Sequence, residues 1–417
     1  MNSEIFERHE SEVRSYCRSF PTVFTRSKNS ELFDEDGKRY IDFFCGAGAL
    51  NYGHNNEYIK NKILDYIKND GVIHSLDMHT SAKREFIETL EKTILEPRGL
   101  DYKIMFPAPT GTNAIEAALK VARKVKKRSN IFAMMGAFHG MTLGSLSLTT
   151  DECSRGGAGV PLTNVTHIPA PYMFPELDTI KYMETLITDD HSGVELPAAI
   201  FIETVQSEGG IHVFSDEWLR RLRALCDKYD ILLVVDDIQV GCGRTGSFFS
   251  FERAGIVPDI VALSKSIGGI GLPFAILLFK PELDMWKPGE HNGTFRGNNP
   301  AFVAAKAALE IFNNENIASE TVRKGCISAS FIEKEILTIN PKLVMRGIGL
   351  VIGIDFAQLG GGDTAKLVMN KAFEKGIIIE RVGRDNAVLK VMPPLTISDE
   401  LLIEGLEKLR DAIKEVL

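Results

Sequence analysis

The stretch ILLVVDDIQVGCGRTG (231–246) decides the fold that this sequence predicts. Its five leading apolar residues are followed by two acids, and an unbroken apolar run of this kind is typical of a strand buried on both faces. Sheets of parallel strands bind ligands at the carboxyl ends of the strands. The two acids therefore predict a ligand site where this strand ends, with a helix cap or a surface turn as the alternative.

Similar apolar runs lie on both sides of this stretch. Helices are expected at 114–127 and 217–229, because apolar residues recur there at helical spacing. Strands that alternate with helices indicate an α/β fold with a mostly parallel sheet covered on both faces. The other strands of this sheet are predicted at 131–138, 198–205, 260–265 and 275–280.

The two ends of the chain follow a different pattern. Near the N-terminus, LFDEDGKRYIDFF (32–44) predicts a hairpin with DEDG as its turn. We expect an N-terminal segment (1–50) that packs with a smaller α+β domain (313–417), and a large domain (51–312) between them. The C-terminal domain is predicted to contain helices around 318–337, 364–375 and 398–415 and strands near 343–356, 377–382 and 388–392.

The composition excludes several classes of protein. The 417 residues include 48 basic and 56 acidic ones, which gives a formal net charge of −8. Binding nucleic acid or an anionic membrane as a main task requires a basic surface instead. The six cysteines are scattered and form no cluster at zinc spacing, so we expect reduced thiols and no metal site. Neither a signal peptide nor a membrane-spanning apolar run is present, which predicts a cytoplasmic location.

The stretch PAPTGTNAIEAALKVARK (107–124) places a glycine turn directly before a helix. The first amides of a helix have no partner within it, and the helix dipole is positive at that end. Gly111 and the hydroxyls of Thr110 and Thr112 therefore predict an anion site. An N-capped helix without a ligand is the alternative.

Three more stretches place polar or planar groups after predicted strands or before helices. In IVALSKSIGGIGLP (260–273), Lys265 follows a strand, where burial of its stem can lower the pKa of the amine. In AFHGMTLGSL (137–146), Phe138 suits stacking on a planar ring. The stretch HNGTFRGNNP (291–300) is a polar loop before a helix. The plainer alternatives are a snorkelling lysine, a core phenylalanine and a surface loop.

Taken together and in this order, these motifs describe one site. It has a cradle for a phosphate, an aromatic plate, an acid for a ring nitrogen and an amine for an aldehyde, the groups that pyridoxal 5′-phosphate requires of a protein. Over nearly its whole length the sequence resembles the class III (ω-type) aminotransferases of fold type I. The resemblance implies a large α/β domain that binds pyridoxal 5′-phosphate and a smaller α+β domain.

The resemblance implies roles for the residues around the cofactor ring. VVDDIQVGCGRTG matches the corresponding family block, with Asp237 where many members have glutamate. Asp236 then pairs with the pyridine nitrogen, Gln239 lies near the phenolic oxygen, and Ile238 packs under the ring. Lys265 matches the lysine that forms a Schiff base with the cofactor and later moves a proton as a base.

The resemblance also implies contacts with the phosphate and with a second subunit. Gly111 and Thr112 match the phosphate cradle of the family. Phe138 matches the aromatic plate, with His139 beside it. Thr294 matches a threonine that reaches the phosphate from the neighbouring subunit. A homodimer with shared active sites is therefore expected at minimum, with a tetramer or a hexamer as alternatives.

A family motif with two glutamates is similar to ETVQSEGGI (203–211). Glu203 is expected to line the site. Glu208 matches a glutamate that, in the ornithine-type branch, forms a switchable ion pair with an arginine that binds the α-carboxylate of glutamate. In this sequence KVMPPL places Lys390 at the position of that arginine. Lysine is a point charge and not a bidentate fork, so a different carboxylate geometry is expected.

The stretch GAGALNYGHNN (46–56) corresponds to the entrance loop of the family. With this loop, the sequence is most similar to a branch that forms L-2,4-diaminobutyrate and 2-oxoglutarate from L-glutamate and L-aspartate 4-semialdehyde, for ectoine synthesis. Siderophore or polyamine synthesis is an alternative pathway. Asn51 and Tyr52 are candidate substrate-binding residues, with packing of the loop as the alternative.

Two other functions stay open. Another ω-aminotransferase, acting on ornithine, acetylornithine or 4-aminobutyrate, is the first, and Lys390 distinguishes this chain from those branches. The second is a non-catalytic binding protein with the same fold. The complete set of Asp236, Gln239 and Lys265 argues against it, because a binding protein has no need of a buried amine.

Overall fold

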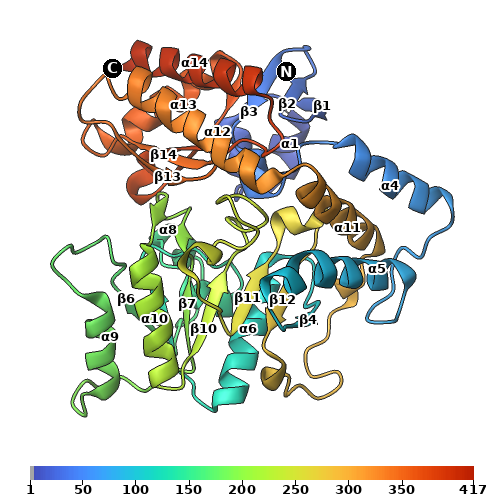
Figure 1. Cartoon of the computed structure of the whole chain (residues 1–417). Helices are drawn as coiled ribbons and strands as arrows, with labels where there is room; N and C mark the ends of the chain where they lie inside the picture. The colour runs from blue at the N-terminus through green and yellow to red at the C-terminus, as the bar shows by residue number, and fades with distance from the viewer. Residues whose placement is uncertain (1–3) are drawn as a thin grey trace.

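The computed structural model describes residues 4–417, so the first three residues of the predicted segment 1–50 lie outside it. A seven-stranded sheet forms the centre of the large domain, in the lower half of Figure 1. The pairs from β11 to β6 are parallel, whereas β12 runs antiparallel to both of its neighbours. In spatial order the strands are β4 (Lys103–Met105), β12 (Ile276–Phe279), β11 (Ile260–Leu263), β10 (Leu232–Asp236), β7 (Ala199–Ile202), β5 (Ile131–Met134) and β6 (Val165–Ile168).

This sheet confirms the predicted α/β fold with a mostly parallel, mixed sheet. The five predicted strands form, and so do the predicted helices, α6 (Gly111–Lys126) and α10 (Asp216–Lys228). The strand predicted at 131–138 ends earlier, because Gly136 has a φ of 84° and turns the chain.

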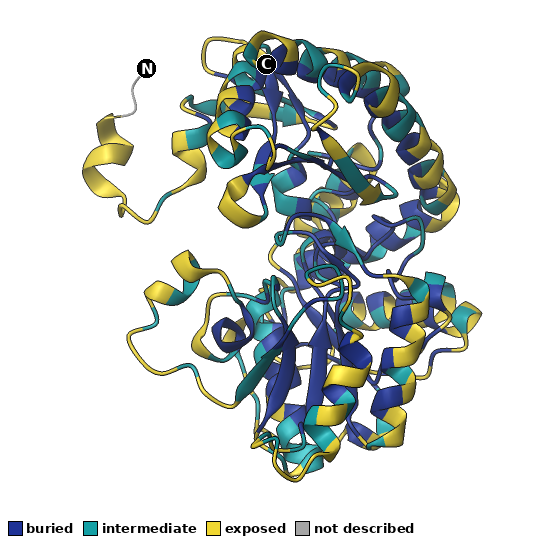
Figure 2. Ribbon diagram, turned by 90° about the vertical axis from the view of Figure 1, so that its left-hand side faces the viewer, coloured by how far each residue is buried: buried dark blue, intermediate teal, exposed yellow. Residues whose placement is uncertain are grey.

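Apolar side chains cover both faces of the sheet. In β10, Leu232 and Val234 contact the layer that contains α6, whereas Leu233 and Val235 contact the layer that contains α10. Burying one such side chain contributes about 1.5–3 kcal/mol. Figure 2 shows buried strands at the centre and exposed residues on the outer sides of the helices. The other helices of this domain are α4 (Glu57–Lys68), α5 (Ser81–Leu90), α7 (Leu143–Leu148), α8 (Glu152–Gly156), α9 (Thr179–Thr188) and α11 (Asn299–Asn314).

A smaller domain lies above the large sheet in Figure 1. The predicted hairpin at 32–44 forms, and its second strand pairs in parallel with a strand from the C-terminal part, opposite Ile377. Ile41 therefore joins the same apolar cluster as Ile377. One sheet has the order β1 (Phe24–Lys28), β2 (Glu31–Asp34), β3 (Arg39–Asp42) and β15 (Ile377–Ile378); the other has the order β13 (Val344–Ile348), β14 (Val351–Asp355), β17 (Val388–Val391) and β16 (Glu380–Val382).

Helices α12 (Ile317–Phe331), α13 (Gly361–Glu374) and α14 (Asp399–Val416) cover these sheets, close to the predicted ranges. The strand predicted at 377–382 divides after Ile378, with β15 in one sheet and β16 in the other. The first helix, α1 (Glu4–His9), buries no residue and stands away from the body in Figure 2. The exact domain boundaries stay a prediction. Within residues 4–417, every helix is too short or too polar to cross a membrane.

Candidate active site

Most of the predicted site residues meet at the carboxyl edge of the large sheet. Glu203 directly follows β7, Asp236 ends β10, and Lys265 comes two residues after β11. With the N-terminus of α6 they surround a cavity of about 160 Å³. The cavity is lined by Gly111, Thr112, Phe138, His139, Gly140, Glu203, Glu208, Asp236, Ile238, Gln239, Val240 and Lys265.

Asp236 is a buried carboxylate that faces a buried histidine. His139 Nδ1 lies 2.7 Å from Asp236 Oδ2, and the N–H of Ile238 donates to Asp236 Oδ1 at 3.1 Å. Burial alone would lower the pKa of His139, but the hydrogen bond and charge of Asp236 outweigh it and raise that pKa. Within residues 4–417, His139 Nε2 has no hydrogen-bond partner. A carboxylate held at the cavity wall is the group that a protonated pyridine nitrogen requires.

Glu203 is the second buried acid of the cavity. Its Oε1 accepts the N–H of Phe138 at 3.0 Å, which ties the loop after β5 to the end of β7. Burial raises the pKa of Glu203 to about 7, and the charge of Asp236 acts in the same direction. The pKa is raised because few partners stabilise the ionised carboxylate, and raised pKa values of this kind are typical of functional sites.

Lys265 is the only amine among the lining residues of this cavity, within the described chain. Its φ of 53° lies in the left-handed region, which costs a residue other than glycine about 1 kcal/mol. The next residue anchors this conformation: Ser266 Oγ donates to Gly48 O at 2.5 Å and accepts the N–H of Asn51 at 3.2 Å. Burial lowers the pKa of Lys265 against the opposing charge of Glu208. A lower pKa increases the share of the neutral, nucleophilic amine.

The N-terminus of α6 forms the anion-binding wall. The helix begins at Gly111, so its positive dipole end faces the cavity. Thr112 Oγ1 lies 2.7 Å from Thr142 Oγ1 and 2.5 Å from Ser145 Oγ. A Cβ on Gly140 would lie 2.5 Å from Thr112 Oγ1, and a Cβ on Gly111 would lie 2.9 Å from a neighbouring side chain. Glycines that let the backbone approach closely, hydroxyl groups and the N-terminus of a helix together fit a phosphate.

Lys390 lies fully buried behind the cavity with two ion pairs. Its Nζ is 2.6 Å from Glu208 Oε1 and 2.8 Å from Glu380 Oε2. Burial alone would lower the pKa of Lys390, but the charges of both glutamates raise it. Gln239 Nε2 also donates to Glu208 Oε1, at 2.9 Å. The structure thus contains the expected pair of Glu208 and Lys390 and adds Glu380.

Besides Lys390, the predicted residues that do not line the cavity are Thr110, Asn51, Tyr52 and Thr294. Asn51 is fully buried, and its side chain donates to Cys242 O at 3.2 Å and accepts from Arg244 at 2.5 Å. Tyr52 is 1% exposed within the large core. Both side chains thus serve the packing of the entrance loop, and the prediction that they bind substrate is not supported. Thr294 is exposed, and its contact with a neighbouring subunit stays a prediction.

The residues that sequence reasoning missed are Gly140, Val240 and Glu380. Gly140 and Val240 line the cavity and follow the predicted residues His139 and Gln239 in the sequence. This adjacency could have indicated both of them. Glu380 faces Lys390 across the antiparallel pair of β16 and β17. The register of two strands depends on the folded sheet, so no local pattern indicates this contact.

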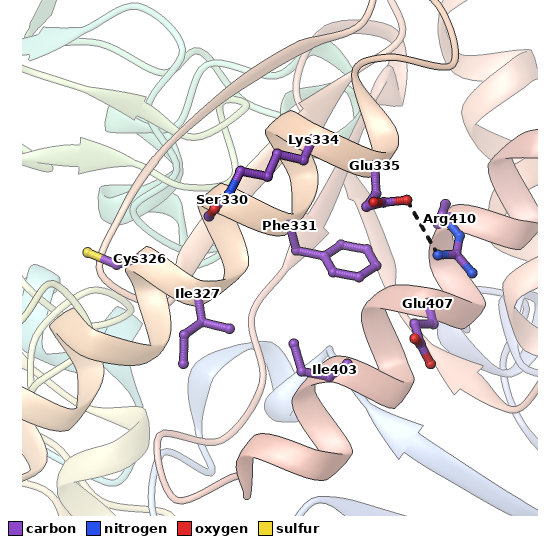
Figure 3. Close-up of a pocket in the computed structure, with 9 residues that line it drawn as sticks. All are labelled: Cys326, Ile327, Ser330, Phe331, Lys334, Glu335, Ile403, Glu407 and Arg410. Atoms are coloured by element: carbon purple, nitrogen blue, oxygen red, sulfur yellow. Dashed lines mark ion pairs between the residues drawn. The ribbon is translucent and has the colours of Figure 1, made fainter.

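A larger hollow of about 600 Å³ lies elsewhere, on the outer side of the small domain (Figure 3). It is open, and an ion pair of 3.6 Å joins Arg410 to Glu335 at its rim. None of the predicted site residues lines it, so it has no part in the candidate active site. Its lining residues are Cys326, Ile327, Ser330, Phe331, Lys334, Glu335, Ile403, Glu407 and Arg410.

Known proteins resemble this chain in sequence over its full length. A diaminobutyrate–2-oxoglutarate transaminase of Sporosarcina pasteurii is 55% identical over 99% of this chain and 97% of that protein. A protein of the same name from Nocardia farcinica is 54% identical over 99% of this chain and 94% of that protein.

Solved structures resemble this chain in fold. An aminotransferase of Bacillus anthracis has a TM-score of 0.87 and 24% identity, over 99% of this chain and 97% of that one. The ornithine aminotransferase of Toxoplasma gondii has a TM-score of 0.86 and 24% identity, over 99% and 93%. The family model described as aminotransferase class-III matches residues 14–413. The chain therefore belongs to the class III aminotransferase family.

Proposed function

We propose that this protein uses pyridoxal 5′-phosphate to transfer the amino group of L-glutamate to L-aspartate 4-semialdehyde, giving 2-oxoglutarate and L-2,4-diaminobutyrate. One observation carries the proposal. Lys265, Asp236 and the start of α6 meet in one cavity, in a chain that is 55% identical to a diaminobutyrate–2-oxoglutarate transaminase. The ectoine pathway is the proposed context.

The residues of the cavity fit the groups of the cofactor. When bound, pyridoxal 5′-phosphate supplies an electron sink for the bonding electrons of the substrate α-carbon. Gly111 and Thr112 would hold its phosphate, and Asp236 would hold its ring nitrogen. Phe138 would cover the ring. Lys265 Nζ would act as the base that moves the proton between the α-carbon of the amino acid and the C4′ carbon of the cofactor.

Two substrates must share this cavity in different orientations. L-Glutamate presents an amine next to its α-carboxylate, whereas the semialdehyde presents an aldehyde far from its α-carboxylate. A carboxylate site must therefore be available beside the reacting atoms in one half-reaction and closed in the other. Glu208 would move away from Lys390 so that the α-carboxylate of glutamate can bind this lysine. It would pair with Lys390 again when the other substrate is bound.

The test is a comparison of amino donors with the purified holoenzyme and 2-oxoglutarate. L-2,4-Diaminobutyrate should give a higher kcat/KM than L-ornithine, N-acetylornithine or 4-aminobutyrate, and glutamate should form in equal amount. A higher kcat/KM for one of the other three donors would replace the proposed substrate. No transfer from any donor would favour a binding protein of this fold.

We also propose a homodimer with shared active sites. Thr294 and its neighbours adjoin the loop that contains His74, whose Nε2 lies 2.7 Å from Thr294 O. Around it, Leu76, Met78 and Phe295 are 42%, 59% and 64% exposed. A cluster of exposed apolar side chains is typical of a surface that another chain covers. Sedimentation of the holoenzyme should give at least twice the chain mass of 46.2 kDa.

A cytoplasmic location completes the proposal. The cysteines of the described chain are all free, two of the exposed ones being Cys17 and Cys153. Exposed thiols are ordinary in a reducing compartment. Fractionation of the producing cells should recover the activity with the cytoplasmic enzymes, and recovery with the membranes or the medium would contradict the location.

A further inference from the structure

Three oxygen atoms lie close to the ammonium of Lys390: those of Glu208 and Gln239 accept hydrogen bonds from it, and that of Glu380 is an ion-pair partner. Glu208 Oε1 lies at 2.6 Å, Glu380 Oε2 at 2.8 Å and Gln239 Oε1 at 3.5 Å. The Lys390 side chain is 0% exposed, so water does not compensate its charge. A buried ammonium therefore depends on its carboxylate partners. It has two, although one would neutralise it.

The two glutamates differ in how they are held. Glu380 lies opposite Lys390 in the pairing of β16 with β17, its side chain is 9% exposed, and its Oε1 accepts the hydroxyl of Tyr16 at 3.1 Å. Glu208 comes from the loop between β8 (Val205–Gln206) and β9 (His212–Val213), lines the cavity, and has a side chain that is 29% exposed. A ligand in the cavity can therefore displace Glu208 but not Glu380.

A buried lysine depends on a fixed carboxylate such as Glu380 more than a buried arginine would. Arginine stays charged even when it is buried, whereas a buried lysine readily loses its proton. Lys265 repels this ammonium, and Tyr16, which donates to Glu380, is neutral in its ordinary form. If Glu208 moves away, Glu380 is the one anion left in direct contact with Lys390 within the described chain.

We propose that Glu380 is a positioning residue that holds the ammonium of Lys390 in place behind the cavity while Glu208 is away, so that a substrate carboxylate can take the place of Glu208. The proposal rests on the proposed function, because it concerns the α-carboxylate of glutamate. It explains why two carboxylates contact one lysine. One of them exchanges with the substrate, and the other keeps the receptor charged and in place during the exchange.

The test uses Glu208→Gln as a mimic of the state in which Glu208 has moved away. Glutarate, a dicarboxylate without an amine, is titrated into the holoenzyme by calorimetry between pH 7 and 9. The Glu208→Gln variant should bind glutarate at least as tightly as the parent, with an affinity that does not depend on pH. In Glu208→Gln/Glu380→Gln the lysine has no anionic partner, so it loses its proton as the pH rises. The affinity for glutarate should then fall by up to about tenfold for each unit of rising pH.

Each result has a definite consequence. Equal pH dependence in the single and the double variant would overturn the proposal, and so would the absence of glutarate binding in both the parent and Glu208→Gln. If the double variant does not fold, Glu208→Gln/Glu380→Asp replaces it, since aspartate keeps the charge but withdraws it by one methylene. It should bind glutarate about threefold or more weakly than Glu208→Gln, and an unchanged affinity would contradict the proposal. If glutarate binds as expected but diaminobutyrate is no substrate, the proposed function fails and this inference stands.

Discussion

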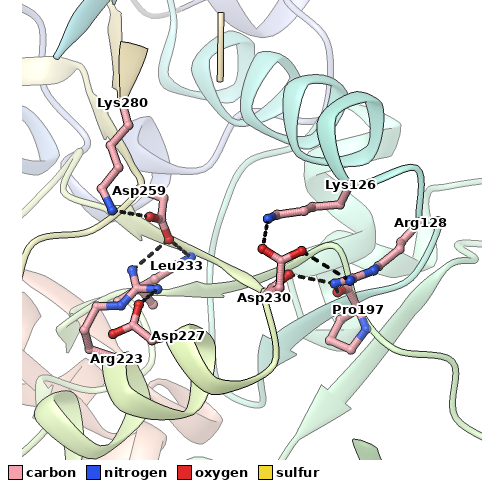
Figure 4. Close-up of polar contacts among 9 residues, drawn as sticks. All are labelled: Lys126, Arg128, Pro197, Arg223, Asp227, Asp230, Leu233, Asp259 and Lys280. Carbon is pink, nitrogen blue, oxygen red and sulfur yellow. Dashed lines mark hydrogen bonds and ion pairs between the residues drawn. The ribbon is translucent and has the colours of Figure 1, made fainter. Parts of the chain in front are cut away.

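Two buried aspartates lie at opposite edges of the same sheet and have different partners. Asp236 ends β10 at the carboxyl edge, whereas Asp259 directly precedes the parallel strand β11 at the other edge. Figure 4 shows Asp259 between two cations. Arg223 Nη1 and Lys280 Nζ each lie 2.7 Å from its oxygens, and the N–H of Leu233 donates to it at 2.7 Å.

Charges that stabilise the fold differ from charges that await a ligand in how far their partners compensate burial. Burial would raise the pKa of Asp259, but Arg223 and Lys280 outweigh it and hold that pKa below its ordinary value. For two groups at the carboxyl edge, burial dominates instead: it raises the pKa of Glu203 and lowers that of Lys265. Glu203 and Lys265 are thus kept without full compensation, at a cost in stability that ligand binding offsets.

The largest effect should come from Lys265→Ala. The cavity then lacks its amine, so transamination should fall by about 10⁴-fold or more. The free energy of unfolding should stay the same or increase, because a buried amine without a close anion is removed. The matched control is Lys280→Ala at the opposite edge, which should keep its rate but lose stability. Rates of the two variants that differ by less than tenfold would break the comparison.

Asp236→Asn should have the second largest effect. A neutral amide no longer favours a protonated ring nitrogen, so kcat should fall by about 10²–10³-fold. His139 also loses the charge that raises its pKa. The measurement is kcat at saturating cofactor and substrates, and a variant that keeps more than a tenth of the parent rate would remove Asp236 from the proposed site.

Asp259→Asn should change stability and leave the rate unchanged. It leaves Arg223 and Lys280 without their carboxylate, which should lower the free energy of unfolding by about 2–4 kcal/mol. The folded pKa of Asp259 lies below its ordinary value of 3.8, so its contribution is complete above that pH and is lost as the pH falls through the folded pKa. Urea unfolding of parent and variant should therefore differ at pH 7 and converge below pH 4.

Glu203→Gln should have the smallest effect and the opposite sign. The folded pKa of Glu203 is about 7 and its ordinary value is 4.5, so the native state keeps a proton that the unfolded chain releases in this window. The parent should lose stability as the pH rises from 4.5 to 7, whereas the variant should not. The cofactor-free variant should exceed the parent by about 2 kcal/mol at pH 7.5. A margin that does not grow between pH 5 and 7.5 would contradict this.

The sequence predicted the buried charged residues at the carboxyl edge of the large sheet but not those at the opposite edge. Apolar runs and helical spacing place Asp236 and Lys265 at ends of neighbouring strands, and the family resemblance supplies their roles. Asp259 has partners that lie 36 and 21 positions away, Arg223 and Lys280, and only the folded sheet brings them together. The direction of β12 was hidden for the same reason, because an apolar run has no strand direction.

The entrance loop shows a second limit of sequence reasoning. Cys45 and Ala47 have φ values of 57° and 56°, a left-handed turn that residues other than glycine rarely adopt. This turn is followed by Asn51 and Tyr52 in the interior, where the sequence predicted substrate contacts. Local propensity does not indicate such strain, because tertiary contacts maintain it: Gln239 Nε2 donates to Ala47 O at 2.9 Å.

The visible absorbance of the purified protein with pyridoxal 5′-phosphate tests most simply whether the carboxyl edge of the large sheet binds the cofactor. We expect an absorbance band from the cofactor attached to Lys265, absent in Lys265→Ala. L-Glutamate and L-2,4-diaminobutyrate, each added alone, should both abolish the band of the parent, because both serve as amino donors to the same site. If the protein shows no band with added cofactor, or a band that neither amino acid changes, the carboxyl edge of the large sheet is not an aminotransferase site.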